Sequence, residues 1–340
     1  MADQPQNSAA FYPWQDKPRE QILRQHDQDK LPHALLLVGQ ANLGKRAFAS
    51  AIARRLLCNS PAANLPCGQC VGCGLFQAGT HPDYRVVQPE ESKQIRVEQV
   101  RSLINWSLQT AQRNGYKVAI IQPAETMNIT TANALLKCLE EPPGKMLFML
   151  VTDQPMKLLP TIRSRCQRVE FPIPAPAQAL GWLEGQLPGR PDLGLLLTIA
   201  GGEPLTVVRD YNEKYLHRRE IIMESMAALV SGRILPADAY QRLTADKEHR
   251  PLETVQVSLG MLADSLRWHF SKDEKVIKNR DMKAHIKLLG DIAGADFLFA
   301  IQDRLLQEAR HLGSTSNPDT NLLLDVLLID ISQRRLELIL

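Results

Sequence analysis

The stretch from Leu35 to Phe48, LLLVGQANLGKRAF, places a short apolar run before a glycine-containing turn and a helical pattern. A phosphate-binding loop is built in this order of strand, turn and helix, and its frame GxxxxGK is complete at Gly39, Gly44 and Lys45. In such a loop, backbone N–H groups surround the phosphates and the lysine reaches the outer ones. The stretch therefore predicts an α/β domain organised around a nucleotide-binding loop.

The residue after Lys45 departs from this pattern. A working loop has Ser or Thr there to hold Mg²⁺, whereas this chain has Arg46, which cannot ligate a metal and carries a competing charge. Gly39, Gly44, Lys45 and the backbone amides remain as candidate nucleotide-binding groups. A lysine in the first turn of a helix is also commonly just solvated, so the sequence leaves ATP binding at this loop open.

The strand expected to supply catalytic carboxylates lacks them as well. In P-loop ATPases a neighbouring strand ends in an Asp that orders Mg²⁺ and a Glu that polarises the attacking water. The matching segment, KVAIIQPAE, ends in Gln122 and Pro123 and has no carboxylate before Glu125. We therefore predict that the chain does not hydrolyse ATP. A weak ATPase that uses Gln122 or Glu125 is the alternative.

Four of the six cysteines follow the helix of the loop in the pattern C-x8-C-x2-C-x2-C, at Cys58, Cys67, Cys70 and Cys73. Clustered cysteines in a chain without an export signal indicate a metal site more than disulfides. Thiolates bind Zn²⁺ tetrahedrally, and four sulfur ligands leave no open position for a substrate. We predict a structural zinc site, with a redox pair or unliganded thiols as alternatives, and place Cys138 in the core.

Composition limits the class of protein. The chain has 340 residues, of which 44% are hydrophobic and 23% charged, as in soluble proteins of roughly two or three domains. A net charge of +3 is too small to argue for nucleic-acid binding by itself. The polar N-terminus, MADQPQNSAAFYPW, does not fit a signal peptide, and the apolar runs are shorter than the ~20 residues that cross a bilayer. We expect a cytoplasmic protein that does not enter a membrane.

Short apolar runs alternate with helical patterns in the first half of the chain. Strands are predicted at 35–38, 83–88, 117–121, 146–152 and 168–171. This alternation predicts a parallel sheet covered by helices on both faces. After the proline-rich segment PIPAPAQ only helical patterns follow. The predicted domains are an α/β domain at 1–173, a small helical domain at 174–214 and a larger helical domain at 215–340.

The segment TIRSRC, from Thr161 to Cys166, lies between the last two predicted strands. An arginine at the end of such a unit can reach the phosphates of a neighbouring subunit, because it stays charged and its planar fork fits phosphate oxygens. From position alone, Arg165 is more commonly a surface ion-pair residue. Arg163, Arg165 and Arg168 are also the only charge support for a third alternative, a zinc-dependent nucleic-acid-binding protein.

Several of these motifs together resemble the AAA+ subunits of bacterial clamp loaders. They are the cysteine insert, the run TTANALLKCLEEPP, the strand ending in LVTDQP, and IRSRC. The resemblance covers about the first 210 residues by motif and the remainder by helical character and length. It implies a P-loop domain with a zinc-binding insert at 58–73, a small helical lid and a C-terminal helical collar through which subunits oligomerise.

The resemblance also implies a function in DNA replication. Members of this family form a ring-like pentamer that opens a sliding clamp and places it on primed DNA, driven by ATP in the motor subunits. The implied partners are the motor subunits gamma and tau, the delta subunit and, through the complex, the sliding clamp and primed DNA of the DNA polymerase III holoenzyme. Motor subunits are expected to carry GKS or GKT and an acidic pair. This chain has neither, which implies a non-hydrolysing member.

By the same resemblance, Arg165 of the SRC motif is an arginine finger that acts in trans on the ATP of the adjacent motor subunit. Thr152 matches a polar sensor position. The Gly-Ser-x-Arg sensor of the lid is replaced by GGEP, from Gly201 to Pro204, so its arginine is missing. All of these departures remove catalysis within the chain, while the donor to a neighbour remains.

Overall fold

The structure is a computed structural model that describes residues 11–62, 65–90, 92–113, 115–246, 248–312 and 319–337, and side chains as far as residue 333. Most of the polar N-terminus and residues 338–340 of the predicted larger helical domain lie outside the described residues, as do residues 63–64 of the predicted zinc-binding insert. The chain divides into two compact units between Trp182 and Leu183. The predicted division into three domains stays a prediction.

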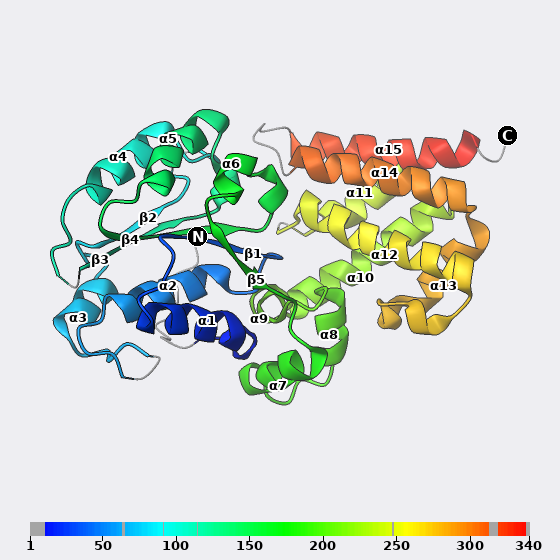
Figure 1. The fold of residues 1–340 in the computed structure, drawn as a ribbon. Helices are drawn as coiled ribbons and strands as arrows, with labels where there is room; N and C mark the ends of the chain where they lie inside the picture. Colours follow the sequence, from blue (N-terminus) through cyan, green and yellow to red (C-terminus); the bar gives the residue numbers. More distant parts are fainter. Residues whose placement is uncertain are drawn as a thin grey trace. The chain divides into compact units, whose positions relative to one another are not determined.

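A five-stranded parallel sheet of order β2-β3-β4-β1-β5 forms the centre of the first unit (Figure 1). All five predicted strands are confirmed, each within one residue of its predicted ends. The strands are β1 (Ala34–Gly39), β2 (Tyr84–Val87), β3 (Tyr116–Ile121), β4 (Lys145–Thr152) and β5 (Gln167–Phe171). Because β1 is an interior strand, the loop after it lies on the carboxyl edge of the sheet between its neighbours β4 and β5.

Helices cover both faces of this sheet (Figure 1). Leu37 and Met149 pack with α1 and α2 on one face, and Phe148 and Leu150 with α4, α5 and α6 on the other. Each strand contributes to both cores because successive side chains point to opposite faces. The helices are α1 (Asp16–Asp27), α2 (Lys45–Leu56), α3 (Val71–Gln77), α4 (Val97–Ser107), α5 (Ile129–Glu140), α6 (Pro160–Arg163) and α7 (Pro176–Gln186), which crosses the boundary between the units.

For one residue of this unit, the predicted helix face does not match the observed burial. The apolar spacing of residues 97–110 predicts a helix with Val97, Val100, Leu103, Ile104 and Leu108 on one face, but Leu108 is 66% exposed. The reason is that α4 ends at Ser107, so the buried stripe finishes with Trp106 and Ser107.

The second unit is helical throughout its described residues. Its helices are α8 (Leu193–Ile199), α9 (Pro204–Asp210), α10 (Glu213–Val230), α11 (Pro236–Thr244), α12 (Pro251–Ser271), α13 (Lys283–Ile292), α14 (Ala295–Leu312) and α15 (Thr320–Glu337). Helices α10 to α15 share one core that includes Met226, Leu262 and Leu328. None of the described helices combines the length and the apolar character that a bilayer-spanning helix needs.

The sheet core of the first unit can be tested at Phe148, which is fully buried on the central strand β4. We predict that Phe148→Ala lowers the free energy of unfolding by about 3–5 kcal/mol, because the surrounding side chains cannot fill the cavity that it leaves. Chemical denaturation measures this change. Met156→Ala, at a side chain that is 78% exposed, is the control and should cost less than about 0.5 kcal/mol. Equal effects would contradict the assigned core.

Candidate functional site

The loop between β1 and α2 has the strand–turn–helix form that the sequence predicted. Gly44 precedes α2 with φ of 77°, a left-handed conformation that favours glycine. A Cβ atom at Gly44 would lie 2.5 Å from a ring carbon of Tyr12, and one at Gly39 would lie 2.4 Å from the carbonyl oxygen of Phe171. Close packing therefore requires glycine at both positions, independently of any bound phosphate.

Lys45 is turned back into its own loop. Its side chain is 2% exposed, and Nζ forms an ion pair with Asp153 Oδ1 at 2.6 Å. Nζ also donates to the carbonyl oxygen of Gly39 at 2.9 Å and to that of Gln40. Since an ammonium group has three N–H donors, these three acceptors occupy all of them. Lys45 would have to break one of these contacts to bind a phosphate.

Side chains from the segment before α1 bind the backbone of the same loop. Trp14 Nε1 and Gln15 Nε2 each donate to the carbonyl oxygen of Leu43 at 3.0 Å, and Gln15 Nε2 also lies 3.1 Å from the carbonyl oxygen of Gly44. Trp14 is 6% exposed, with its ring stacked on Tyr12 at a centroid distance of 5.0 Å. The loop is thus held from both sides by groups of its own chain.

The residues at the expected magnesium and water positions make contacts within the chain. Arg46 donates from a terminal nitrogen to Gln88 Oε1 at 2.9 Å. Glu125 Oε1 accepts from the backbone N–H of Asp153 at 3.3 Å. Gln122 is 6% exposed, and its Oε1 has no hydrogen-bond partner among the described residues. Glu125, the carboxylate that the alternative ATPase would use, therefore supports the backbone beside Asp153.

Neither of the two predicted sensor positions has a positively charged side chain. Thr152 ends β4, is 1% exposed, and accepts at Oγ1 from the backbone N–H of Gln154 at 3.1 Å. Gly201 and Gly202 have φ of 65° and 88° and separate α8 from α9. Pro204, at the place of the expected sensor arginine, is the first residue of α9.

The four cysteines of the insert converge. The Sγ atoms of Cys58, Cys67, Cys70 and Cys73 all lie within 4.8 Å of one another, with Cys58 Sγ 3.5 Å from Cys67 Sγ and 3.8 Å from Cys70 Sγ. Sulfurs bound to zinc at ~2.3 Å in a tetrahedron lie about 3.8 Å apart, whereas a disulfide requires about 2.05 Å. The donor set and its spacing therefore fit a zinc ion that these four residues could hold.

Backbone N–H groups are directed at these sulfurs. The N–H of Cys67 lies 3.3 Å from Cys58 Sγ, and those of Asn59 and Cys73 lie 3.4 Å from Cys70 Sγ. Burial raises the pKa of the Cys70 thiol, but the N–H donors of Cys73 and Asn59 outweigh it and bring the pKa to about 6. Burial raises the pKa of Cys73 to about 12. Thiolates are the metal-binding form, so these N–H groups favour metal binding most directly at Cys70.

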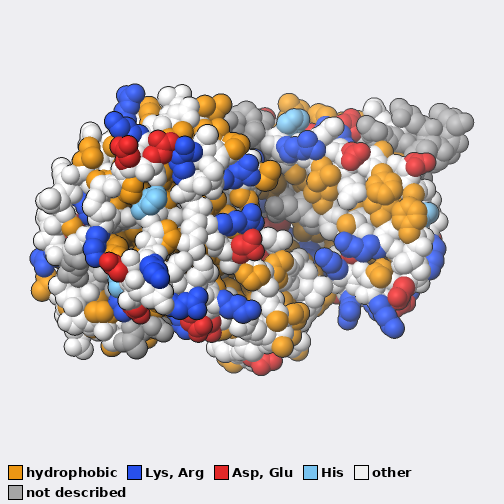
Figure 2. Space-filling view, viewed as in Figure 1, with side chains coloured by type: hydrophobic (Ala, Val, Ile, Leu, Met, Phe, Trp, Pro, Cys, Tyr) orange, Lys and Arg blue, Asp and Glu red, His pale blue; other side chains and the backbone are white. Residues whose placement is uncertain are grey.

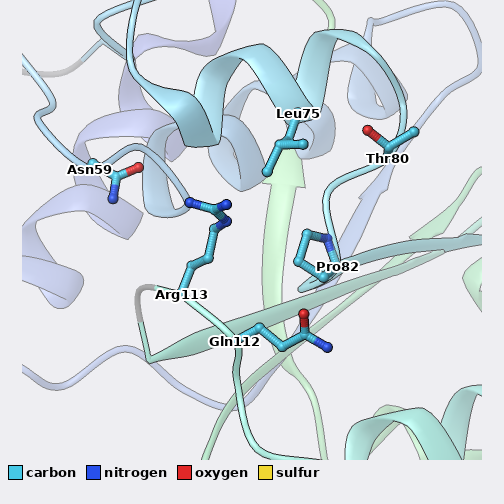
Figure 3. Close-up of a pocket in the computed structure, with 6 residues that line it drawn as sticks. All are labelled: Asn59, Leu75, Thr80, Pro82, Gln112 and Arg113. Carbon is cyan, nitrogen blue, oxygen red and sulfur yellow. The ribbon is translucent and has the colours of Figure 1, made fainter.

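An open pocket of about 700 Å³ lies beside this insert (Figure 3). The Arg113 side chain extends across it toward Asn59, whose Oδ1 accepts from the backbone N–H of Gly72 at 3.2 Å. Gln112 and Arg113 form one wall of the pocket. Their backbone N–H groups donate to the buried Asp83 at 2.9 and 3.0 Å, which fixes the position of this wall. The sequence patterns did not identify this pocket, because its residues come from separate segments of the chain. No residue predicted for a site lines it.

Arg165 follows α6, and its guanidinium contacts its own chain. One terminal nitrogen forms an ion pair with Glu140 Oε1 at 2.5 Å. The other donates to the carbonyl oxygen of Thr161 at 3.0 Å and lies 3.5 Å from Ser164 Oγ. The Arg165 side chain is 34% exposed. The structure thus places Arg165 in the surface ion pair that its position alone favoured, with part of the guanidinium open to solvent.

The other two arginines of the proposed basic cluster are also engaged. Arg163 donates to Met156 Sδ at 3.1 Å, and Arg168 pairs with Glu170 at 3.1 Å. With Arg165 on Glu140, two of the three cations face a carboxylate. The charge support for a nucleic-acid-binding surface is therefore weak.

Two family models match the chain, "DNA polymerase III, delta subunit" over residues 14–175 and "DNA polymerase III, delta subunit, C terminal" over residues 213–333. Curated relatives named DNA polymerase III subunit delta' include one from Pseudomonas aeruginosa, 41% identical over 331 residues that cover 94% of this chain and 97% of the relative. Another, from Escherichia coli, is 31% identical over 324 residues, or 94% of this chain and 95% of the relative. Among solved structures, a gamma subunit-related protein of DNA polymerase III from Thermotoga maritima aligns with 94% of this chain and 99% of its own, at 17% identity and a TM-score of 0.40.

The metal site yields a prediction at Cys67. We expect Cys67→Ser to lose bound zinc and to lower the stability of the first unit, because three thiolates hold the ion less tightly than four. Zinc content of the purified chain and its thermal unfolding measure the two effects. Cys138→Ala, at a buried cysteine outside the cluster, is the control and should keep one equivalent. One full equivalent of zinc in Cys67→Ser would exclude this site.

Proposed function

The chain belongs to the family of DNA polymerase III delta' subunits, and from this premise we propose that it is a non-hydrolysing clamp-loader subunit that donates Arg165 to a neighbour's ATP site. One contrast carries the proposal. Lys45 is buried with all three donors on acceptors of its own chain, whereas the Arg165 guanidinium lies partly at the surface. The first arrangement opposes hydrolysis within the chain, and the second allows a contact with another subunit.

The absence of hydrolysis follows from three missing parts. Arg46 stands where a hydroxyl would ligate Mg²⁺, and Gln122 and Pro123 stand where carboxylates would order the metal and the water. Lys45 would also have to leave Asp153, Gly39 or Gln40 before it met a phosphate. With no ordered metal, a nucleotide that entered the loop would lack most of the transition-state stabilisation that phosphoryl transfer needs.

Arg165 is suited to act on ATP bound by the adjacent subunit. Guanidinium stays protonated at any physiological pH and presents N–H groups in a plane that matches two phosphate oxygens. An arginine placed on the γ-phosphate neutralises charge that develops in the transition state, and such a residue supplied by another subunit can raise the rate 10³-fold or more. We assign Arg165 this role, on the gamma or tau subunit.

The remaining parts are assigned structural roles. The cysteine insert at 58–73 would hold a zinc ion with no catalytic function, since four thiolates fill its coordination. Residues 174–214 would form the lid and residues 215–340 the collar that joins this chain to gamma or tau and delta. The sliding clamp and primed DNA would be reached through that complex, in the cytoplasm.

Exposed apolar side chains support the collar assignment. Leu322, Val326 and Ile329 form a stripe along α15 and are 60%, 39% and 38% exposed. Phe270 on α12 and Phe299 on α14 are 67% and 46% exposed, and their ring centroids lie 6.4 Å apart. Hydrophobic side chains gather over the surface of α12 and α14 (Figure 2). Apolar surface of this kind is typical of a face that another subunit covers.

The first test uses the isolated chain. We predict that the purified protein with Mg²⁺ and ATP releases phosphate no faster than the buffer, and that Lys45→Ala does not change this rate, because the metal-ordering groups are missing. A motor subunit with an intact GKS or GKT loop is the positive control. Turnover that Lys45→Ala abolished would instead support the alternative of a weak ATPase.

The second test uses the assembly reconstituted with gamma or tau and delta. We predict that Arg165→Ala lowers ATP turnover by ~10³-fold at the one site that it completes, so that total turnover falls by the share of that site. Steady-state phosphate release measures the change, and gel filtration checks that the variant still assembles.

Arg168→Ala is the matched control, because it removes an exposed arginine near the same strand without touching Arg165. It should leave turnover unchanged. Normal turnover in an intact Arg165→Ala assembly would remove the trans role and leave the chain as a structural spacer.

A further inference from the structure

The carboxylate that pairs with Arg165 belongs to Glu140, in the run TTANALLKCLEEPP that carries part of the family resemblance. Glu140 is the last residue of α5, and Arg165 follows the short helix α6. The guanidinium bridges the two helix ends, with Glu140 Oε1 at 2.5 Å on one side and the carbonyl oxygen of Thr161 at 3.0 Å on the other. Both terminal nitrogens of Arg165 are thus bound by oxygen acceptors of its own chain.

The surroundings of Arg165 in this position attract a cation and repel an anion. The carboxyl end of a helix carries partial negative charge from its unpaired carbonyl groups, and Glu140 adds a full charge at the end of α5. Glu141, the next residue, adds a second one nearby. A γ-phosphate that approached the guanidinium where it now lies would come close to these carboxylates. Arg165 must therefore leave Glu140, at least in part, before it can neutralise a phosphate.

We propose that Glu140 is a positioning residue that holds Arg165 withdrawn against α5 and sets how readily it reaches the phosphate of the neighbouring subunit. This inference rests on the trans role of Arg165. The pair is well placed for such exchange, since Arg165 and Glu140 are 34% and 49% exposed. Ion pairs that are open to solvent hold their partners weakly, and a phosphate carries more charge than a carboxylate.

Glu141 supplies a matched control. It follows Glu140 directly at the end of α5, and within the described part of the chain its carboxylate has no ion pair. A change from carboxylate to amide at Glu141 therefore removes the same charge from the same helix end without touching the Arg165 guanidinium. A general effect of charge on α5 or on assembly would appear at both positions, and an effect through Arg165 only at Glu140.

The experiment measures ATP turnover of the reconstituted assembly with Glu140→Gln, Glu141→Gln, Arg165→Ala and the double variant Glu140→Gln/Arg165→Ala. We expect Glu140→Gln to raise kcat at the affected site by about 1.4- to 5-fold, the range that corresponds to an exposed ion pair. KM for ATP should change little, because the gain applies to the transition state. Glu141→Gln should match the wild type, and Glu140→Gln should add nothing once Arg165 is alanine.

Unchanged or lower turnover in Glu140→Gln, with Arg165→Ala still impaired, would overturn the withdrawn position and leave the trans arginine standing. An effect of Glu140→Gln that persisted in the Arg165→Ala background would also overturn it, because Glu140 would then act through another group. Normal turnover of an intact Arg165→Ala assembly would remove the trans role itself, and with it the basis of this proposal. Gel filtration of each assembly separates all three results from a failure to associate.

Discussion

The ammonium group of Lys45 holds the loop between β1 and α2 closed through its contacts with its own chain. A buried cation is costly unless acceptors surround it, and here Asp153 and the carbonyl oxygens of Gly39 and Gln40 supply them. Asp153 comes from the end of β4 and the two carbonyls from the end of β1, so one side chain ties two neighbouring strands together. Because Asp153 is 42% exposed, this pair opens at a lower cost than a fully buried one. Lys45, the lysine of a nucleotide-binding frame, therefore helps to hold the ends of β1 and β4 together.

The other contacts of this loop are consistent with a structural role for Lys45. Tyr12 fills the space beside Gly44, and Trp14 and Gln15 bind the carbonyl oxygens that the loop presents. Glu125 contacts the backbone of Asp153 and so supports the partner of Lys45. All of these contacts are made within the chain and need no nucleotide. The loop is therefore stable as a self-contained turn, and its glycines are explained by packing alone.

Local sequence was sufficient for the strands and the cysteine cluster, and insufficient for the contacts of the charged residues. The interior strands β1, β3 and β4 are nearly continuous apolar runs with sharp ends, so they were predicted closely, as were the shorter and more polar edge strands β2 and β5. The spacing of Cys58, Cys67, Cys70 and Cys73 was sufficient to predict that they converge. The end of α4 was missed because residues 108–114 include no glycine or proline to mark it. Asp153 as the partner of Lys45, and Glu140 as that of Arg165, lie on other elements far along the chain. Only the topology brings each pair together.

The two sites of the proposed function lie toward opposite edges of the sheet. Lys45, Gln122 and Asp153 follow β1, β3 and β4, so they lie at the carboxyl edge of the parallel sheet. Arg165 precedes β5 and Glu140 precedes β4, which places both toward the amino edge. Strands of five to eight residues separate these edges by about 15–25 Å. Substitutions such as Arg46 and Pro123 therefore alter the chain's own loop without touching Arg165. In the clamp loader that we propose, where subunits associate head to tail, Arg165 can therefore serve a neighbour independently of the groups at the chain's own loop.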